Sequence, residues 1–143
     1  MSTPPALPAS GRRLEDYVVG ATYALGSIAV EEAEVLAFAN RFDPQAFHTD
    51  PDAAATGPFG GLIASGWHTT ALMMRLYALS YLGDVPSYGS PGVDEVRWPA
   101  PVRPGDVLSA QVTVQDRRVF RSKPDRGIVQ GLVEVFNQTG ARC

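Results

Sequence analysis

Apolar and polar positions follow two different periods along this chain. Between residues 31 and 82 apolar side chains recur at helical spacing, whereas from residue 92 onward they alternate with polar ones. Helical spacing predicts helices with a buried face, and alternation predicts strands with one face turned to a core. The chain is therefore expected to be α+β, with one buried helix packed against an antiparallel sheet.

The first expected helix covers residues 31–42. Its apolar positions at i, i+3, i+4 and i+7 form one face and are Val35, Phe38, Ala39 and Phe42. Pro44 ends this helix, because the residue before a proline is pushed out of the helical conformation.

A longer helix is expected over residues 62–82, after the Gly- and Pro-rich bend at 57–61. Only Arg75 is charged in this segment, so the helix is expected to be buried nearly all round. A very short helix is expected to begin between the two long ones, where Asp50 is a good N-cap and Pro51 fits the first helical position.

Three segments of the second half read as strands, at residues 92–98, 107–115 and 128–137. In the middle one the residues expected to share the buried face are Leu108, Ala110, Val112 and Val114. Turn-like residues at 99–105 and 121–127 separate the strands. Near the start, residues 17–27 are expected to form a short strand pair or an extended lead-in.

Composition narrows the functional classes. The chain has 143 residues with 45% hydrophobic and 19% charged, which is typical of one soluble globular domain. A net charge of −3 disfavours nucleic acid or an anionic membrane as the main partner. With Cys143 as the single cysteine and no apolar run of about 20 residues, an intracellular, cytoplasmic protein is expected. Residues 1–13 are expected to be a disordered leader before a single domain over residues 14–143.

The chemistry-bearing segment is Phe42 to Pro51, which contains Asp43 and His48. Asp43 lies where the first helix ends, and the negative end of the helix dipole predicts a carboxylate more basic than one at the surface. A tight loop could bring both side chains to one water molecule, as an acid/base addition of water requires. The alternative is a helix-end turn residue and a buried, hydrogen-bonded histidine.

Gly66 lies at the start of the long helix in Ala64-Ser65-Gly66-Trp67-His68. The first N–H groups of a helix have no partner within it, so this one could stabilise a developing oxyanion. Tight packing of helix on sheet explains Gly66 equally well. His68 is interpreted as a packed or hydrogen-bonded residue, because its spacing from His48 matches no standard metal site.

Together these windows resemble the MaoC-like dehydratases, which include the (R)-specific enoyl-CoA hydratases. The hydratase motif reads Asp, any residue, Asn, Pro, an aliphatic residue, then His, and Asp43 and His48 match it in identity and spacing. Gln45 and Ala46 replace the Asn and the Pro, and Ser65 stands where many hydratases have His. The segments 92–98 and 101–106 are also similar to the family.

The resemblance implies a hot-dog fold, a long helix wrapped by an antiparallel sheet, and a homodimer. It implies reversible hydration of trans-2-enoyl-CoA to (R)-3-hydroxyacyl-CoA, with Asp43 and His48 as catalytic residues and Gly66 as the oxyanion hole. Ser65, Trp67 and Gln45 are expected to bind substrate. No metal and no redox cofactor are expected, and coenzyme A enters only as part of the substrate.

One departure is that family members usually continue past the Gly140 turn with a further strand, so the final strand is expected to be truncated here. Two rival functions stay open. A hot-dog acyl-CoA thioesterase would hydrolyse the thioester and would not need the Asp43/His48 pair. A non-catalytic acyl-CoA-binding subunit would bind the same ligand without turnover.

Overall fold

The computed structural model describes residues 12–83 and 85–143. The predicted disordered leader falls on residues 1–11, which lie outside the described residues, and on Arg12 and Arg13. Arg12 is described and is only 3% exposed, with its guanidinium over the rings of Tyr17 and Tyr81. Arg12 therefore packs against aromatic residues of the core although it falls within the expected leader.

Three antiparallel strands form one sheet in the order β1-β2-β3, which are Thr22–Ala29, Val107–Val119 and Gly127–Phe136. Tyr23 on β1 and Val133 on β3 both lie opposite Val112 on the central strand. The predicted alternation along β2 is confirmed, because Leu108, Ala110, Val112 and Val114 are all buried. Alternate side chains of a strand point to one face, so this face forms the sheet side of the core.

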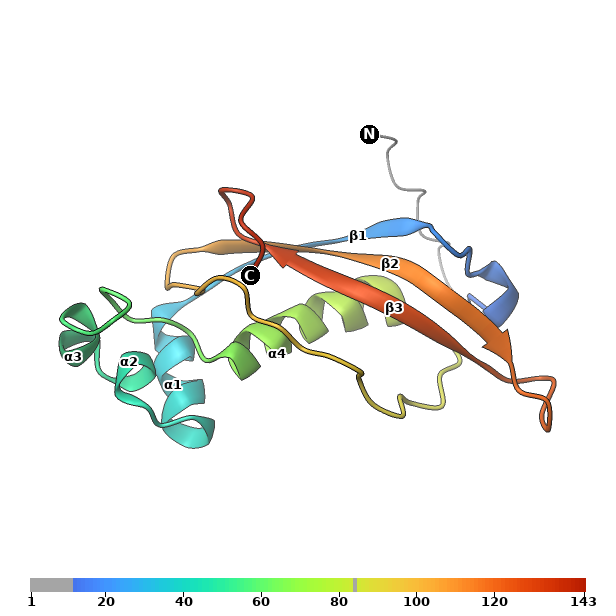
Figure 1. Cartoon of the computed structure of the whole chain (residues 1–143), viewed down its shortest axis with the longest axis horizontal. Coiled ribbons are helices and arrows are strands. Elements are labelled where there is room, and N and C mark those ends of the chain that lie inside the picture. The colour runs from blue at the N-terminus through green and yellow to red at the C-terminus, as the bar shows by residue number, and fades with distance from the viewer. Residues whose placement is uncertain (1–11, 84) are drawn as a thin grey trace.

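Helix α4 (Gly66–Tyr77) lies along that buried face of the sheet and continues as a π-helix, η2 (Ala78–Leu82) (Figure 1). Leu72 and Leu76 belong to the same core cluster as the strand residues. The mixed architecture of helix on antiparallel sheet is thus confirmed.

The predicted long helix is wrong in two respects. It begins at Gly66 and not at residue 62, and it is not buried all round, since Trp67, Met74 and Leu79 are 59%, 44% and 67% exposed. Within the described residues the sheet covers only one side of α4, so the opposite side stays open.

Three further helices gather at one end of the molecule, beside the start of α4 (Figure 1). They are α1 (Glu32–Phe42), α2 (Ala46–Thr49) and α3 (Pro51–Ala55). The prediction for α3 is confirmed, because the Asp50 side chain accepts hydrogen bonds from the backbone N–H groups of Asp52 and Ala53. The sequence reading missed α2, a helix of one turn.

The strand predicted at residues 92–98 is wrong, because this segment is extended but makes no ladder with the sheet. Val93 in this segment is 77% exposed. The segment is joined to β3 by one side-chain hydrogen bond, which Gln130 donates to Asp94. No strand among residues 12–83 and 85–143 lies close enough to supply its backbone partners. No helix in these same ranges is both long and apolar enough to span a membrane.

Candidate active site

Asp43 lies at the point where α1 ends. Its backbone N–H donates to the Ala39 carbonyl at 2.9 Å, and Pro44 then prevents the helix from continuing. The side chain is 19% exposed and turns toward the segment that precedes α4. A short turn therefore places one carboxylate between two helices.

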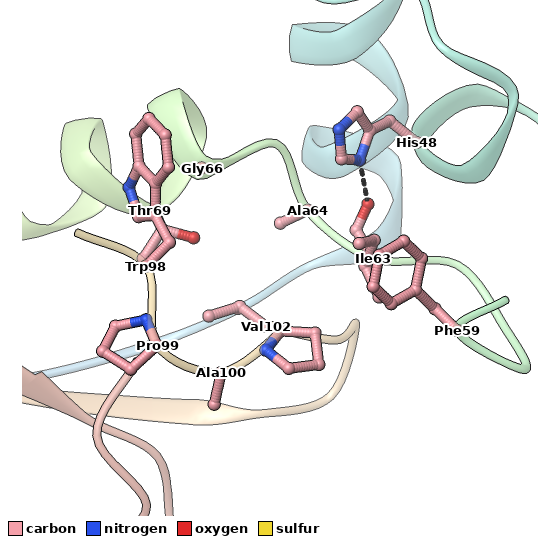
Figure 2. A pocket seen from close by; sticks show the side chains of 11 residues that line it. His48, Phe59, Ile63, Ala64, Gly66, Thr69, Trp98, Pro99, Ala100 and Val102 are labelled. Atoms are coloured by element: carbon pink, nitrogen blue, oxygen red, sulfur yellow. Dashed lines mark hydrogen bonds between the residues drawn. The ribbon is translucent and has the colours of Figure 1, made fainter.

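His48 lies on α2 and is only 5% exposed. Its Nδ1 is 2.8 Å from the Ile63 carbonyl oxygen, which can only accept a hydrogen bond, so Nδ1 carries a proton and donates it (Figure 2). The other ring nitrogen, Nε2, lies 3.3 Å from Asp43 Oδ2. The predicted convergence of the two side chains is present, although a one-turn helix produces it and not a loop.

Two neighbours hold the Asp43 carboxylate. Ser65 donates a hydrogen bond of 2.7 Å to Oδ2, and Gln45 donates one of 2.7 Å to Oδ1. Hydrogen bonds to the charged form lower the pKa of Asp43, with Ser65 the largest cause and Gln45 the next. The prediction of an unusually basic Asp43 is therefore wrong, because these donors outweigh burial.

Residues 63–66 connect all of these groups. The Ile63 N–H donates to the Phe47 carbonyl at 3.0 Å, while the Ile63 carbonyl receives the His48 ring. Ser65 is fully buried and holds Asp43, and Gly66 then begins α4. Among the described residues no carbonyl or side chain accepts a hydrogen bond from the Gly66 N–H, as expected for the first residue of a helix.

A pocket of about 260 Å³ opens beside His48 and Gly66 (Figure 2). Thr69 adds a hydroxyl to its wall. Apolar side chains make most of the rest, and they are Phe59, Ile63, Ala64, Trp98, Pro99, Ala100, Pro101 and Val102. The arrangement suits a small apolar group with one polar end directed to the start of α4.

The remaining candidates take other places. Gln45 and Ser65, both expected to bind substrate, contact Asp43, and Trp67 is exposed with its ring edge packed on Trp98. None of the three lines the pocket. Asp43 does not line the pocket either, but its Oδ2 lies 3.3 Å from His48 Nε2, and His48 and Trp98 both line the pocket.

His68 is a packed residue, in agreement with its interpretation from the sequence. Its Nε2 is 3.1 Å from Glu34 on α1, and its ring stacks on Phe38 at 4.9 Å. It thereby fastens α1 to α4. Over the described ranges, no three His, Cys, Asp or Glu side chains lie together as a metal site would require.

Sequence reasoning missed two features of the site. Ser65 is 22 residues from Asp43, so no local spacing links the two side chains. Phe59 and Trp98 reach the pocket from the 57–61 bend and from the segment after α4. In the sequence, only the aromatic character of Trp98 next to the turn-like Pro99 could have indicated that this segment lines a pocket.

Comparison with known proteins assigns the chain to a protein family. The model of the MaoC-like domain family matches residues 17–135. The crystal structure of a MaoC-like dehydratase from Rhodospirillum rubrum is 44% identical and has a TM-score of 0.84, with 92% of this chain and 90% of that chain covered.

Two further relatives carry names that describe an activity. An (R)-hydratase from A. caviae is 30% identical with a TM-score of 0.69, over 90% of this chain and 92% of that chain. The 3-hydroxyacyl-thioester dehydratase Z of Mycobacterium tuberculosis is 39% identical over 118 residues, which are 81% of this chain and 78% of that protein. The chain therefore belongs to the MaoC-like domain family, and its helix and antiparallel sheet form the family's hot-dog fold.

Proposed function

We propose that this protein reversibly hydrates trans-2-enoyl-CoA to (R)-3-hydroxyacyl-CoA. The observation that carries the proposal is the approach of His48 Nε2 to Asp43 Oδ2 at 3.3 Å, beside a pocket that also reaches Gly66. A carboxylate and an imidazole at this separation can share one water molecule. The names of the A. caviae hydratase and the mycobacterial dehydratase support the same reaction class.

The hydrogen bonds assign a role to each group. Because the pKa of Asp43 is lowered, this side chain stays a carboxylate and orients the water. Nδ1 of His48 is committed to the Ile63 carbonyl, so Nε2 is the nitrogen that accepts a proton from that water. The water oxygen then bonds to C3 of the enoyl group.

The electrons of the C2–C3 double bond move toward the thioester as water adds. The carbonyl oxygen gains negative charge, and the Gly66 N–H with the positive end of the α4 dipole stabilises it. The Asp43/His48 pair returns a proton to C2, so the elements of one water molecule are added and nothing is oxidised or reduced. Residues of this chain are sufficient for each of these steps.

We assign Ser65 and Gln45 as positioning residues for Asp43 in this reaction. Both donate to its carboxylate and neither lines the pocket. This revises the expectation that they bind the substrate directly.

The test uses crotonyl-CoA, with loss of the conjugated enoyl absorbance and release of free thiol followed in parallel. Loss of absorbance without thiol supports hydration, and chiral analysis of the product tests the (R) configuration. Thiol release would support a thioesterase instead. Binding without either signal would support a non-catalytic subunit.

Asp43→Asn and His48→Ala test the pair directly. Each is expected to lower kcat by about 100-fold or more, since general acid–base groups contribute factors of that order. Asp52→Asn is the matched control, because Asp52 is an exposed residue of α3 outside the pocket. A wild-type rate in Asp43→Asn or His48→Ala would remove that residue from the mechanism.

We also propose that two copies of the chain associate as a homodimer. Large apolar side chains are exposed on α4 and on the segment 92–98, among them Met74 and Val93. A second copy would remove this surface from water. Light scattering should give twice the mass of the chain, and a monomer at the assay concentration would refute the dimer.

A further inference from the structure

Gly66 and Trp98 compete for the same space. A Cβ atom built on Gly66 would lie 2.4 Å from Cδ2 and 2.5 Å from Cε2 of the Trp98 indole. These distances are far shorter than any van der Waals contact between carbon atoms. Gly66 lies in an ordinary helical turn and has no positive φ. Close approach of the indole is therefore what requires a glycine here.

The first turn of α4 holds the indole in this position. Trp98 Nε1 donates a hydrogen bond of 3.2 Å to the Thr70 hydroxyl, which donates in turn to the Gly66 carbonyl at 3.0 Å. The Trp67 ring packs edge-on against the indole with 5.0 Å between centroids. Trp98 is thus held against α4. In the chain it follows a long, mostly exposed stretch over residues 85–97 that contains no helix or strand.

The same indole forms a wall of the pocket. Figure 2 shows Trp98 and His48 on opposite sides of it, with Ala64 between them. Trp98 is 43% exposed, so the ring stands between the start of α4 and the surroundings of the protein. A group that enters the pocket meets the indole on one side and the His48 ring on the other.

We propose that Trp98 positions the thioester by covering one side of the Gly66 backbone. A carbonyl oxygen can then reach the Gly66 N–H only from the side of the pocket on which His48 lies. The inference rests on the proposed function and adds a positioning residue to it. Restricting the approach matters because an oxyanion donor works only when the oxygen arrives in line with it.

The first test replaces Trp98 by Phe and by Ala. Trp98→Ala is expected to lower kcat for crotonyl-CoA by about 10-fold to 100-fold, as expected when a reacting group is misplaced by about 1 Å. KM should change less than kcat, because the other walls of the pocket remain. Trp98→Phe should lie between Trp98→Ala and the wild type, since a smaller ring covers less of Gly66.

Tyr88→Ala is the control, because it removes an exposed aromatic ring from the same connecting segment outside the pocket. It should leave kcat unchanged. A purely structural role of Trp98 would lower the melting temperature without lowering kcat of the folded protein. A kcat of Trp98→Ala within about 2-fold of the wild type would overturn the proposal.

The second test is a double-variant cycle. Gly66→Ala keeps the backbone N–H but pushes the indole aside, so its kcat should fall in the wild-type background. In the Trp98→Ala background the added methyl group has room. There Gly66→Ala should lower kcat by a factor at least about 3-fold smaller than in the wild-type background. An equal cost in both backgrounds would overturn the coupling. If Gly66→Ala does not fold, Thr70→Val replaces it, since it removes the hydroxyl that holds the indole.

Failure of the proposed function can be told apart from failure of this inference. If the wild type does not hydrate crotonyl-CoA, calorimetry and tryptophan emission still report binding, because the chain has only two tryptophans. An emission change that Trp98→Phe abolishes, with binding retained, would support contact between Trp98 and the thioester. No binding, no emission change, or a change that survives in Trp98→Phe would overturn it.

Discussion

Ser65 donates a hydrogen bond of 2.7 Å to the carboxylate of Asp43 from a position 22 residues away in the chain. The serine is fully buried and precedes the first residue of α4, so its hydroxyl has a fixed direction. It is the largest cause of the lowered pKa of Asp43. The contact ties the carboxylate to the start of the helix that carries Gly66.

Ser65→Ala should therefore disturb both the placement and the ionisation of Asp43. We expect kcat to fall by about 10-fold or more, because a freely rotating carboxylate holds the water less well. The NMR titration profile of the Asp43 carboxyl group should move to higher pH, because loss of a donor to the charged form raises the pKa of Asp43. Ser80→Ala is the matched control, since its hydroxyl bonds the Leu25 carbonyl away from the site. An unchanged profile would contradict the role of Ser65.

Gln45→Ala should have a smaller effect than Ser65→Ala. Gln45 donates to the other carboxylate oxygen from an exposed position, where water can replace it. We expect kcat to fall by about 3-fold, the size associated with one ordinary hydrogen bond. Steady-state kinetics on the two variants side by side would check the order, and a larger loss in Gln45→Ala would contradict it.

Asp43 should make folding stability depend on pH at the acid end. Its pKa is lower in the folded protein than the ordinary value of 3.8, so the folded state favours the carboxylate. That stabilisation is present above the unfolded pKa and is lost as pH falls through the folded pKa. The free energy of unfolding of the wild type should therefore drop more steeply than that of Asp43→Asn below about pH 4. Urea titrations at several pH values would measure this, and parallel curves would refute it.

His68→Phe should preserve activity. The ring stacks on Phe38 and its Nδ1 has no hydrogen-bond partner among the described residues, so a phenyl ring keeps the packing and loses only the contact with Glu34. We expect kcat within about 2-fold of the wild type and a loss of about 1 kcal/mol of stability, as for conservative core changes. Crotonyl-CoA kinetics with thermal unfolding would check both values. Loss of kcat in a stably folded variant would instead give His68 a part in catalysis.

Local patterns in the sequence predicted what local forces decide. Alternation at 107–115 identified the buried face of β2, and Asp50 before Pro51 identified the start of α3, because each depends on neighbours in the chain. The Asp43/His48 pair could be proposed for the same reason, since the two residues are close in the chain, one at the end of α1 and the other on α2.

The errors concern features that distant contacts decide. The sign of the Asp43 pKa shift depends on Ser65, which the helix-dipole argument ignored. The segment 92–98 alternates like a strand, but alternation does not supply a neighbouring strand to pair with. Apolar composition likewise predicted a helix buried nearly all round over residues 62–82, whereas the sheet covers only one side of α4.

The tetrapeptide 63–66 limits how the site can change over evolution. Successive residues of this stretch fix the imidazole, the carboxylate and the amide in relation to one another, through bonds to His48 and Asp43 and through the start of α4. The reacting groups therefore share a single frame that does not include the strands. Mutations at Phe59 or Pro101 reshape the pocket wall and can alter which molecules the pocket accepts. The distances between the imidazole, the carboxylate and the amide are unchanged by such mutations.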